Sequence, residues 1–218
     1  MKKVFFLVLM AAFLAASAFA QNQPGLDQVL ALLDRASAGF KSVQTDFVWD
    51  QYQKVVDEHD IQKGVMYFKR VGNATDVAAD IRFPAPGKKV LLKNGSLQVL
   101  TRKSGQVTPY DTAKNRESFE SFLALGFGGH SSDLTKNFQL HYAGTETVNG
   151  VTTYKLELIP KSDRVKQMFP RITLWINQQT GMSEQQWLDQ GEGDYRKATF
   201  SSIKLNPPKL PDDAFRLK

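Results

Sequence analysis

The chain has 218 residues, of which 42% are hydrophobic and 23% charged, and its formal net charge is +6. This length corresponds to one domain, and this composition is typical of a globular protein rather than a disordered or multi-span membrane chain. Because there is no cysteine, disulfide scaffolds, thiolate zinc sites, iron–sulfur clusters and cysteine nucleophiles are excluded. The basic charge favours an anionic membrane surface or an acidic partner, since no zinc-finger, RNP or basic-helix pattern indicates nucleic-acid binding.

The first twenty residues have the pattern of a secretory signal peptide. Lys2 and Lys3 precede an apolar run over 4–16, and Ala18–Ala20 supplies the small residues of a cleavage site. The run is shorter than the roughly 20 residues that a membrane span needs, which disfavours the alternative of an uncleaved anchor helix. We therefore predict a signal peptide over 1–20 that is cleaved after Ala20, a periplasmic location, and a single domain over 21–218.

The exported chain is predicted to begin with a helix and to continue mainly as strands. Apolar residues recur at helical spacing over 24–38, with Pro24 suited to a first turn and Gly39 to an end. A strand with one wetter face follows from Val43 to Trp49, and a turn over 57–60 leads to the next strand. Further strands are expected at 63–70, 77–83, 88–93, 96–102, 106–110, 138–143, 152–159, 171–176, 182–188 and 195–205.

Apolar residues at helical spacing occur again between the predicted strands. This spacing predicts a helix over 115–125 and a short helix that starts at Ser131 or Ser132 and runs through Leu134. The segment 162–169 is compatible with a helical turn or a loop, and the proline-rich tail is expected to be extended, with 214–217 able to dock as a last edge strand. About eleven strands with short links should pair antiparallel, which predicts a mainly β fold with a helical lid (α+β), as a curved sheet or barrel.

Residues that could carry chemistry are scattered. The three histidines do not have metal-ligand spacing, and His59 lies among acidic residues that predict a solvated turn. The segment 126–129 matches no phosphate-binding motif, and His130–Ser132 is explained as a glycine loop followed by a helix cap. We therefore expect no catalytic residue, no metal and no cofactor, although a hydrolase with an unrecognised pair of carboxylates stays open as an alternative.

The apolar residues suggest instead that a functional site lies in the interior of the protein. The chain contains 15 phenylalanines, three tryptophans and five methionines, most of which an ordinary core explains. A curved sheet capped by helices can also leave a cavity for an apolar ligand. Hiding a sixteen-carbon acyl chain from water is worth roughly 12 kcal/mol, at about 0.8 kcal/mol per CH₂.

Strand parity and helical spacing predict which side chains face such a cavity. From the strands these are Phe47, Trp49, Met66, Phe68, Val77, Ala79 and Ile81, and from the helices Leu30, Leu33, Phe119, Phe122 and Leu123.

Five segments, in this order, resemble motifs of one family of envelope proteins. They are 43–47 (VQTDF), 64–70 (GVMYFKR), 94–97 (NGSL), the stretch from Leu123 to Phe138, and the stretch from Phe200 to Phe215 with its LPDDAF close. Together they span nearly the whole exported chain and resemble the outer-membrane lipoprotein carrier family, the LolA-type periplasmic carriers.

The resemblance implies an unclosed antiparallel barrel whose apolar concave face is covered by helices. It further implies a monomeric carrier that receives acylated lipoproteins from an inner-membrane lipoprotein-releasing transporter and passes them to an outer-membrane lipoprotein receptor. Arg70 stands where the family has a strand-end arginine that holds the lid closed by hydrogen bonds; the alternative is an ordinary exposed arginine. The chain departs from the family pattern at Val71, where a proline is expected, and at Ala79, where a tryptophan is expected.

A second function fits the same fold. An envelope sensor or binding module could use the open barrel for a glycolipid or another amphiphile without delivering lipoproteins.

Overall fold

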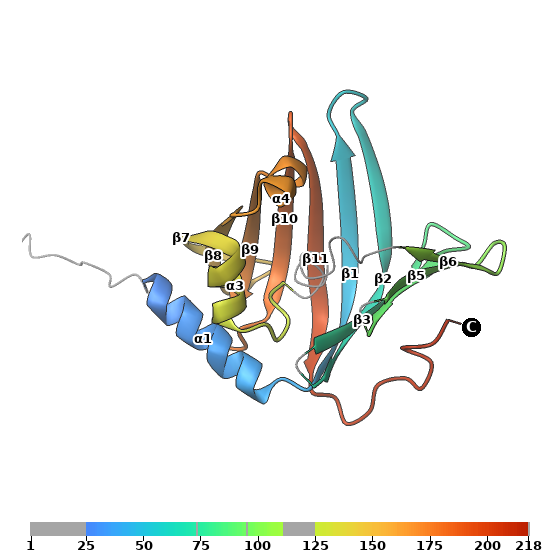
Figure 1. Cartoon of the computed structure of the whole chain (residues 1–218), viewed down its shortest axis with the longest axis horizontal. Helices are drawn as coiled ribbons and strands as arrows, with labels where there is room; N and C mark the ends of the chain where they lie inside the picture. Colours follow the sequence, from blue (N-terminus) through green and yellow to red (C-terminus); the bar gives the residue numbers. More distant parts are fainter. Residues whose placement is uncertain (1–24, 73, 95, 111–124, 218) are drawn as a thin grey trace, which may run out of the picture.

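The computed structural model describes residues 25–72, 74–94, 96–110 and 125–217 (Figure 1). The predicted signal peptide and its cleavage site lie outside the described residues. So does the helix predicted over 115–125, except for Leu125, and with it the predicted lid residues Phe119, Phe122 and Leu123.

The fold is one curved antiparallel sheet of eleven strands (Figure 1). The strands are β1 (Ser42–Gln53), β2 (Glu58–Val71), β3 (Ala74–Phe83), β4 (Lys88–Lys93), β5 (Ser96–Thr101), β6 (Gln106–Tyr110), β7 (Phe138–Val148), β8 (Val151–Pro160), β9 (Arg171–Asn177), β10 (Ser183–Gly191) and β11 (Asp194–Leu205). Their order is β6-β5-β4-β3-β2-β1-β11-β10-β9-β8-β7, so consecutive strands pair everywhere except between β6 and β7, and the first strand pairs with the last. The sheet is unclosed, with β6 and β7 as its two edges. This confirms the mainly β fold and the expected number of strands.

Two helices cover the β7–β9 half of the sheet, and a third lies at its end (Figure 1). These are α1 (Leu26–Gly39), α3 (Ser131–Asn137) and α4 (Asp163–Met168). The buried residues Val29, Leu32 and Leu33 recur at helical spacing, which forms the apolar face of α1. That face packs with Leu134 of α3 and with Leu174 of β9. Among the described residues, no helix is long and apolar enough to cross a membrane.

The concave side of the sheet carries two apolar clusters. One combines β1–β4 and β11 with Phe40, Phe127 and Met182, and it contains the six strand residues Phe47, Met66, Phe68, Val77, Ala79 and Ile81. The other lies between the helices and strands β8–β9. The parity predicted from the sequence therefore holds in this part of the sheet.

The C-terminal tail, in which an edge strand was predicted over 214–217, covers part of the convex side of the sheet. Residues 212–215 form a turn rather than a strand, with Ala214 only 1% exposed. Ala214 packs with Val65 and Tyr67 of β2, supported by Leu210 and Phe215. The predicted strand over 214–217 is thus wrong, because the tail approaches the face of the sheet through its apolar side chains, while the free edges are at β6 and β7.

Two other local predictions change. The turn lies at 54–57 and β2 already begins at Glu58, so His59 is in a strand, not in a solvated turn. It pairs with Tyr52 across β1, and its Nδ1 lies 2.7 Å from Oδ1 of Asp50. The undecided segment 162–169 contains α4, and the short helix predicted from Ser131 is confirmed but extends to Asn137. No group of three or more His, Asp or Glu side chains within the described ranges could hold a metal ion.

Candidate functional site

The predicted cavity residues on the strands are packed in the concave cluster. The six named above are at most 3% exposed. Trp49 is half-buried and contacts the Phe47 ring edge-on, with 5.2 Å between the centroids. On α1, Leu33 is buried and Leu30 is half-buried, both in the second cluster. The strand and helix residues therefore belong to two neighbouring clusters.

A loop before α3 packs against the concave face of the sheet. Residues 125–130, called here the glycine loop, place Phe127 on the sheet with no exposed surface. Its ring stacks on Phe68 at a centroid distance of 4.3 Å and an interplanar angle of 15°. It meets Phe200 of β11 edge-on at 4.8 Å. Phe127 thus covers the concave face at Phe68 and Phe200, beside Phe40 and Met182 of the same cluster.

Two glycines allow Phe127 to reach this position. Gly126 and Gly128 have φ angles of +76° and +77°, a region that L-residues rarely adopt. A Cβ at Gly126 would lie 2.5 Å from the Cβ of Ser183, and a Cβ at Gly128 would lie 2.4 Å from the Phe40 ring. Both positions therefore require glycine for backbone conformation and for space.

Arg70 holds the glycine loop against α1. Its Nη2 donates to the backbone oxygen of Gly128 and, at 3.1 Å, to Oγ of Ser37 on α1. Ser37 Oγ itself donates to the Gly128 oxygen at 2.8 Å. The guanidinium also lies over the Phe40 ring, 5.4 Å from its centroid. The end of β2, the end of α1 and the glycine loop thus meet at the half-buried guanidinium of Arg70. The Nε of Arg70 is buried without a hydrogen-bond partner in the described part of the chain.

The other end of the loop is held by β10. The backbone N–H of Ser183 donates to the Gly126 oxygen at 3.0 Å, and Nε2 of Gln186 donates to the Leu125 oxygen. Gln186 is only 7% exposed, so this polar side chain is buried with its partner on the loop. The sequence analysis did not identify Gln186, Ser37 or Phe127; the only signal was the glycine-rich run around Phe127.

Helix α3 is attached to α1 by one carboxylate. Asp34 Oδ1 accepts from the backbone N–H of Ser131 at 2.8 Å, and its Oδ2 accepts from the Ser131 hydroxyl at 2.7 Å. These hydrogen bonds hold the pKa of Asp34 below its ordinary value of 3.8. They satisfy a donor at the start of α3, where His130 provides no side-chain cap.

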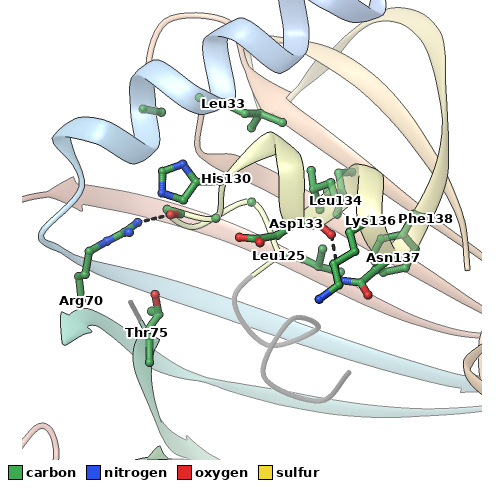
Figure 2. A pocket seen from close by; sticks show the side chains of 17 residues that line it. Leu33, Arg70, Thr75, Leu125, His130, Asp133, Leu134, Lys136, Asn137 and Phe138 are labelled. Carbon is green, nitrogen blue, oxygen red and sulfur yellow. Dashed lines mark hydrogen bonds between the residues drawn. The ribbon is translucent and has the colours of Figure 1, made fainter. Parts of the chain in front are cut away.

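A cavity of about 330 Å³ adjoins the glycine loop. Figure 2 shows Leu33 of α1 on one side, Arg70 and Thr75 from the strands on another, and the loop with α3 between them. Its wall combines apolar and polar residues. The lining residues are Leu33, Ala36, Arg70, Ala74, Thr75, Leu125, Gly126, Gly128, Gly129, His130, Asp133, Leu134, Lys136, Asn137, Phe138, Leu174 and Gly181. Of the predicted site residues that the structure describes, Leu33 and Arg70 alone line this cavity.

Comparison with known proteins supports the fold alone. No family model matches the sequence, and no curated protein matches it. Among solved structures, the Pseudomonas aeruginosa MucA/MucB complex matches with a TM-score of 0.54 at 16% identity, covering 87% of this chain and 60% of that chain. The Mycobacterium tuberculosis lipoprotein LppX matches with a TM-score of 0.50 at 16% identity, covering 85% and 99%.

A LolA superfamily protein from Nitrosomonas europaea also aligns, at 16% identity over 88% of this chain and 97% of that chain, with a TM-score of 0.43. The unclosed antiparallel sheet with its covering helices is the fold class that the sequence analysis predicted. The matches with TM-scores of 0.54 and 0.50 support the resemblance inferred from the sequence at the level of the fold.

Proposed function

We propose that this protein is a periplasmic carrier that shields the acyl chains of lipoproteins and takes them from the inner to the outer membrane. The observation that carries the proposal is the packing of Phe127 on the apolar concave face, on a glycine loop that Arg70 holds at its Gly128 end and β10 holds at its Leu125–Gly126 end.

In this mechanism an acyl chain displaces the Phe127 ring and takes over its contacts with the sheet. The exchange replaces one buried apolar group by another, so its free-energy cost is small compared with leaving the chain in water. The adjoining cavity of about 330 Å³ lies at the lower end of the 300–1,000 Å³ range of ligand pockets. Displacing the loop would add the space now filled by Phe127.

Arg70 supplies a closure that a ligand can break. Charge-assisted hydrogen bonds contribute roughly 1.5–3 kcal/mol each, enough to favour the closed state and little enough for a long acyl chain to overcome. Transfer then needs no chemical step, only an acceptor that binds the acyl chains more tightly than the carrier does. We accordingly propose that the protein is not an enzyme and that its partners are a lipoprotein-releasing transporter and an outer-membrane receptor.

The test is a release assay on spheroplasts. The purified exported chain is added, and acylated lipoprotein in the soluble fraction is measured by native mass spectrometry of its complex with the protein. We expect a complex with the wild-type chain, and altered transfer to outer-membrane vesicles for Arg70→Leu. Arg164→Leu, which removes an exposed arginine of α4, serves as the matched control. Absence of any lipoprotein complex would overturn the carrier proposal, and unchanged transfer by Arg70→Leu would remove Arg70 from the mechanism.

A second function has support from one comparison. MucB has a similar fold and was solved in complex with MucA, so an open barrel of this kind is compatible with a sensor or binding module. This chain spans about 60% of the MucB chain, and the pairing is a property of MucB. A glycolipid adduct in place of a lipoprotein in the native mass spectrum would favour this alternative.

A further inference from the structure

A second hollow lies where the C-terminal tail leaves β11. Figure 1 shows the tail running below the sheet from the end of this strand. We call this hollow the tail groove. Its volume is about 690 Å³, and it is bounded by the junction of α1 and β1, the ends of β2 and β4, and the tail. Its lining residues are Phe40, Lys41, Ser42, Lys69, Arg70, Lys93, Pro207, Pro208, Lys209, Leu210, Pro211, Asp212, Phe215 and Arg216.

The tail groove is strongly basic. Six of its lining residues are lysine or arginine, and its one acid, Asp212, is paired with Lys209 at 3.0 Å. The other exposed cations are Lys41, Lys69, Lys93 and Arg216, and none of them forms an ion pair with a described carboxylate.

Asp76 is the nearest expected partner, because it pairs with Lys69 in the β2–β3 register. Its Oδ1 instead accepts from the backbone N–H of Asn94 at 3.4 Å. Cations from three strand or helix ends and from the tail are thus gathered around one hollow without neutralising charge. This arrangement attracts an anion.

The wall between these cations is apolar. Phe40 and Phe215 line the groove together with the tail prolines and Leu210. Phe40 also packs into the concave cluster, and Phe215 packs against the convex cluster. An inorganic anion would use the cations and leave this apolar wall unused. A molecule with an anionic head and an apolar body would use both.

We propose that the tail groove binds the phosphate of an anionic phospholipid and so seats the protein on a membrane surface. The lysines and Arg216 contact the phosphate, and the apolar wall contacts the glycerol and the first part of the acyl chains. Each Lys or Arg near an anionic bilayer surface strengthens binding by about fivefold. The proposal goes beyond the carrier function, because it concerns lipids of the bilayer itself and needs no lipoprotein.

The test is cosedimentation of the full exported chain with vesicles that contain no protein. Vesicles of phosphatidylcholine with a minor share of phosphatidylglycerol are compared with vesicles of phosphatidylcholine alone. We expect binding only to the former, weakened by high salt. The double variant Lys69→Gln/Lys93→Gln should bind about 25-fold more weakly, since two basic contacts are lost. Its fold is checked by circular dichroism.

The matched control is Lys103→Gln/Lys166→Gln, which removes the same net charge from two exposed positions outside the groove. Equal losses in both double variants would mean that only net charge matters and would overturn the proposal, as would absence of vesicle binding. Calorimetric titration separates the sources of phosphate: we expect binding of short-chain phosphatidylglycerol. Binding of inorganic phosphate alone, or of an acidic peptide such as polyglutamate but not of vesicles, would also overturn it.

The outcome is independent of the carrier proposal. Neither substituted lysine belongs to the glycine loop or its contacts with Arg70. A failed lipoprotein release assay with normal vesicle binding would therefore reject the carrier function alone, and the reverse result would reject the phospholipid site alone.

Discussion

Phe127→Ala should make the protein less stable and should increase its affinity for acyl chains. The ring has no exposed surface and lies between Phe68 and Phe200, so its removal should cost roughly 3–5 kcal/mol of unfolding free energy. In the wild-type chain a ligand must first expose this ring, which costs roughly 1.5–3 kcal/mol. The variant has no ring to expose, so its affinity for an acyl chain should be about ten- to a hundredfold higher than that of the wild type.

The assay combines urea denaturation with titration of a fluorescent sixteen-carbon fatty acid. The matched control is Tyr67→Ala, which removes a buried ring from the convex face, where Tyr67 packs against Ala214. It should lose comparable stability and gain no affinity. If Phe127→Ala is destabilised but binds the probe no more tightly than wild type, or if Tyr67→Ala gains as much, the reasoning that Phe127 occupies the ligand site is refuted.

Three further changes test other contacts. Gly128→Ala should destabilise the protein by more than about 1 kcal/mol in urea denaturation, because φ is +77° and the new Cβ would meet the Phe40 ring. Asp34→Asn should cost under about 1 kcal/mol at neutral pH, by weakening the bonds to Ser131. Since the folded-state pKa of Asp34 lies below 3.8, its contribution is present above that value and is lost as pH falls through the folded pKa; the two chains should therefore become equally stable in strong acid. A stability difference that persists there would contradict this role. Ala214→Asp should cost roughly 2–4 kcal/mol, because it buries a charge on the convex face, and an unchanged melting temperature would show that the tail does not pack there in solution.

Much of the sheet could be predicted from the sequence because successive side chains of a strand alternate between the two faces of the sheet. Phe47, Met66 and Phe68 face the concave side as alternation predicts. The tail was mispredicted for a related reason. Val65 and Tyr67 looked like the outer half of a strand, and nothing in their alternation reveals that Ala214, about 150 residues later, covers them.

The site was only partly predictable. Leu33 and Arg70 line the cavity, as their positions on a helix face and at a strand end implied. Phe127 was missed because it lies in a glycine-rich loop without periodicity, where only the three-dimensional path of the backbone decides which way a ring points. Ser37 was missed because its role depends on the Gly128 carbonyl, 91 residues away in sequence.

The pairing of the first strand with the last has a consequence for how the molecule is made. Strands β1–β6 and β7–β11 are each a series of local hairpins, and only the β1–β11 ladder joins them. Next to that ladder, Asn206 Oδ1 accepts from the backbone N–H of Lys41, across 165 residues of sequence. Closing so long a loop is slow. The concave cluster that combines β1–β4 with β11 is therefore complete only once β11 has been synthesised and has paired with β1, whereas the cluster between the helices and β8–β9 does not include the β1–β11 ladder.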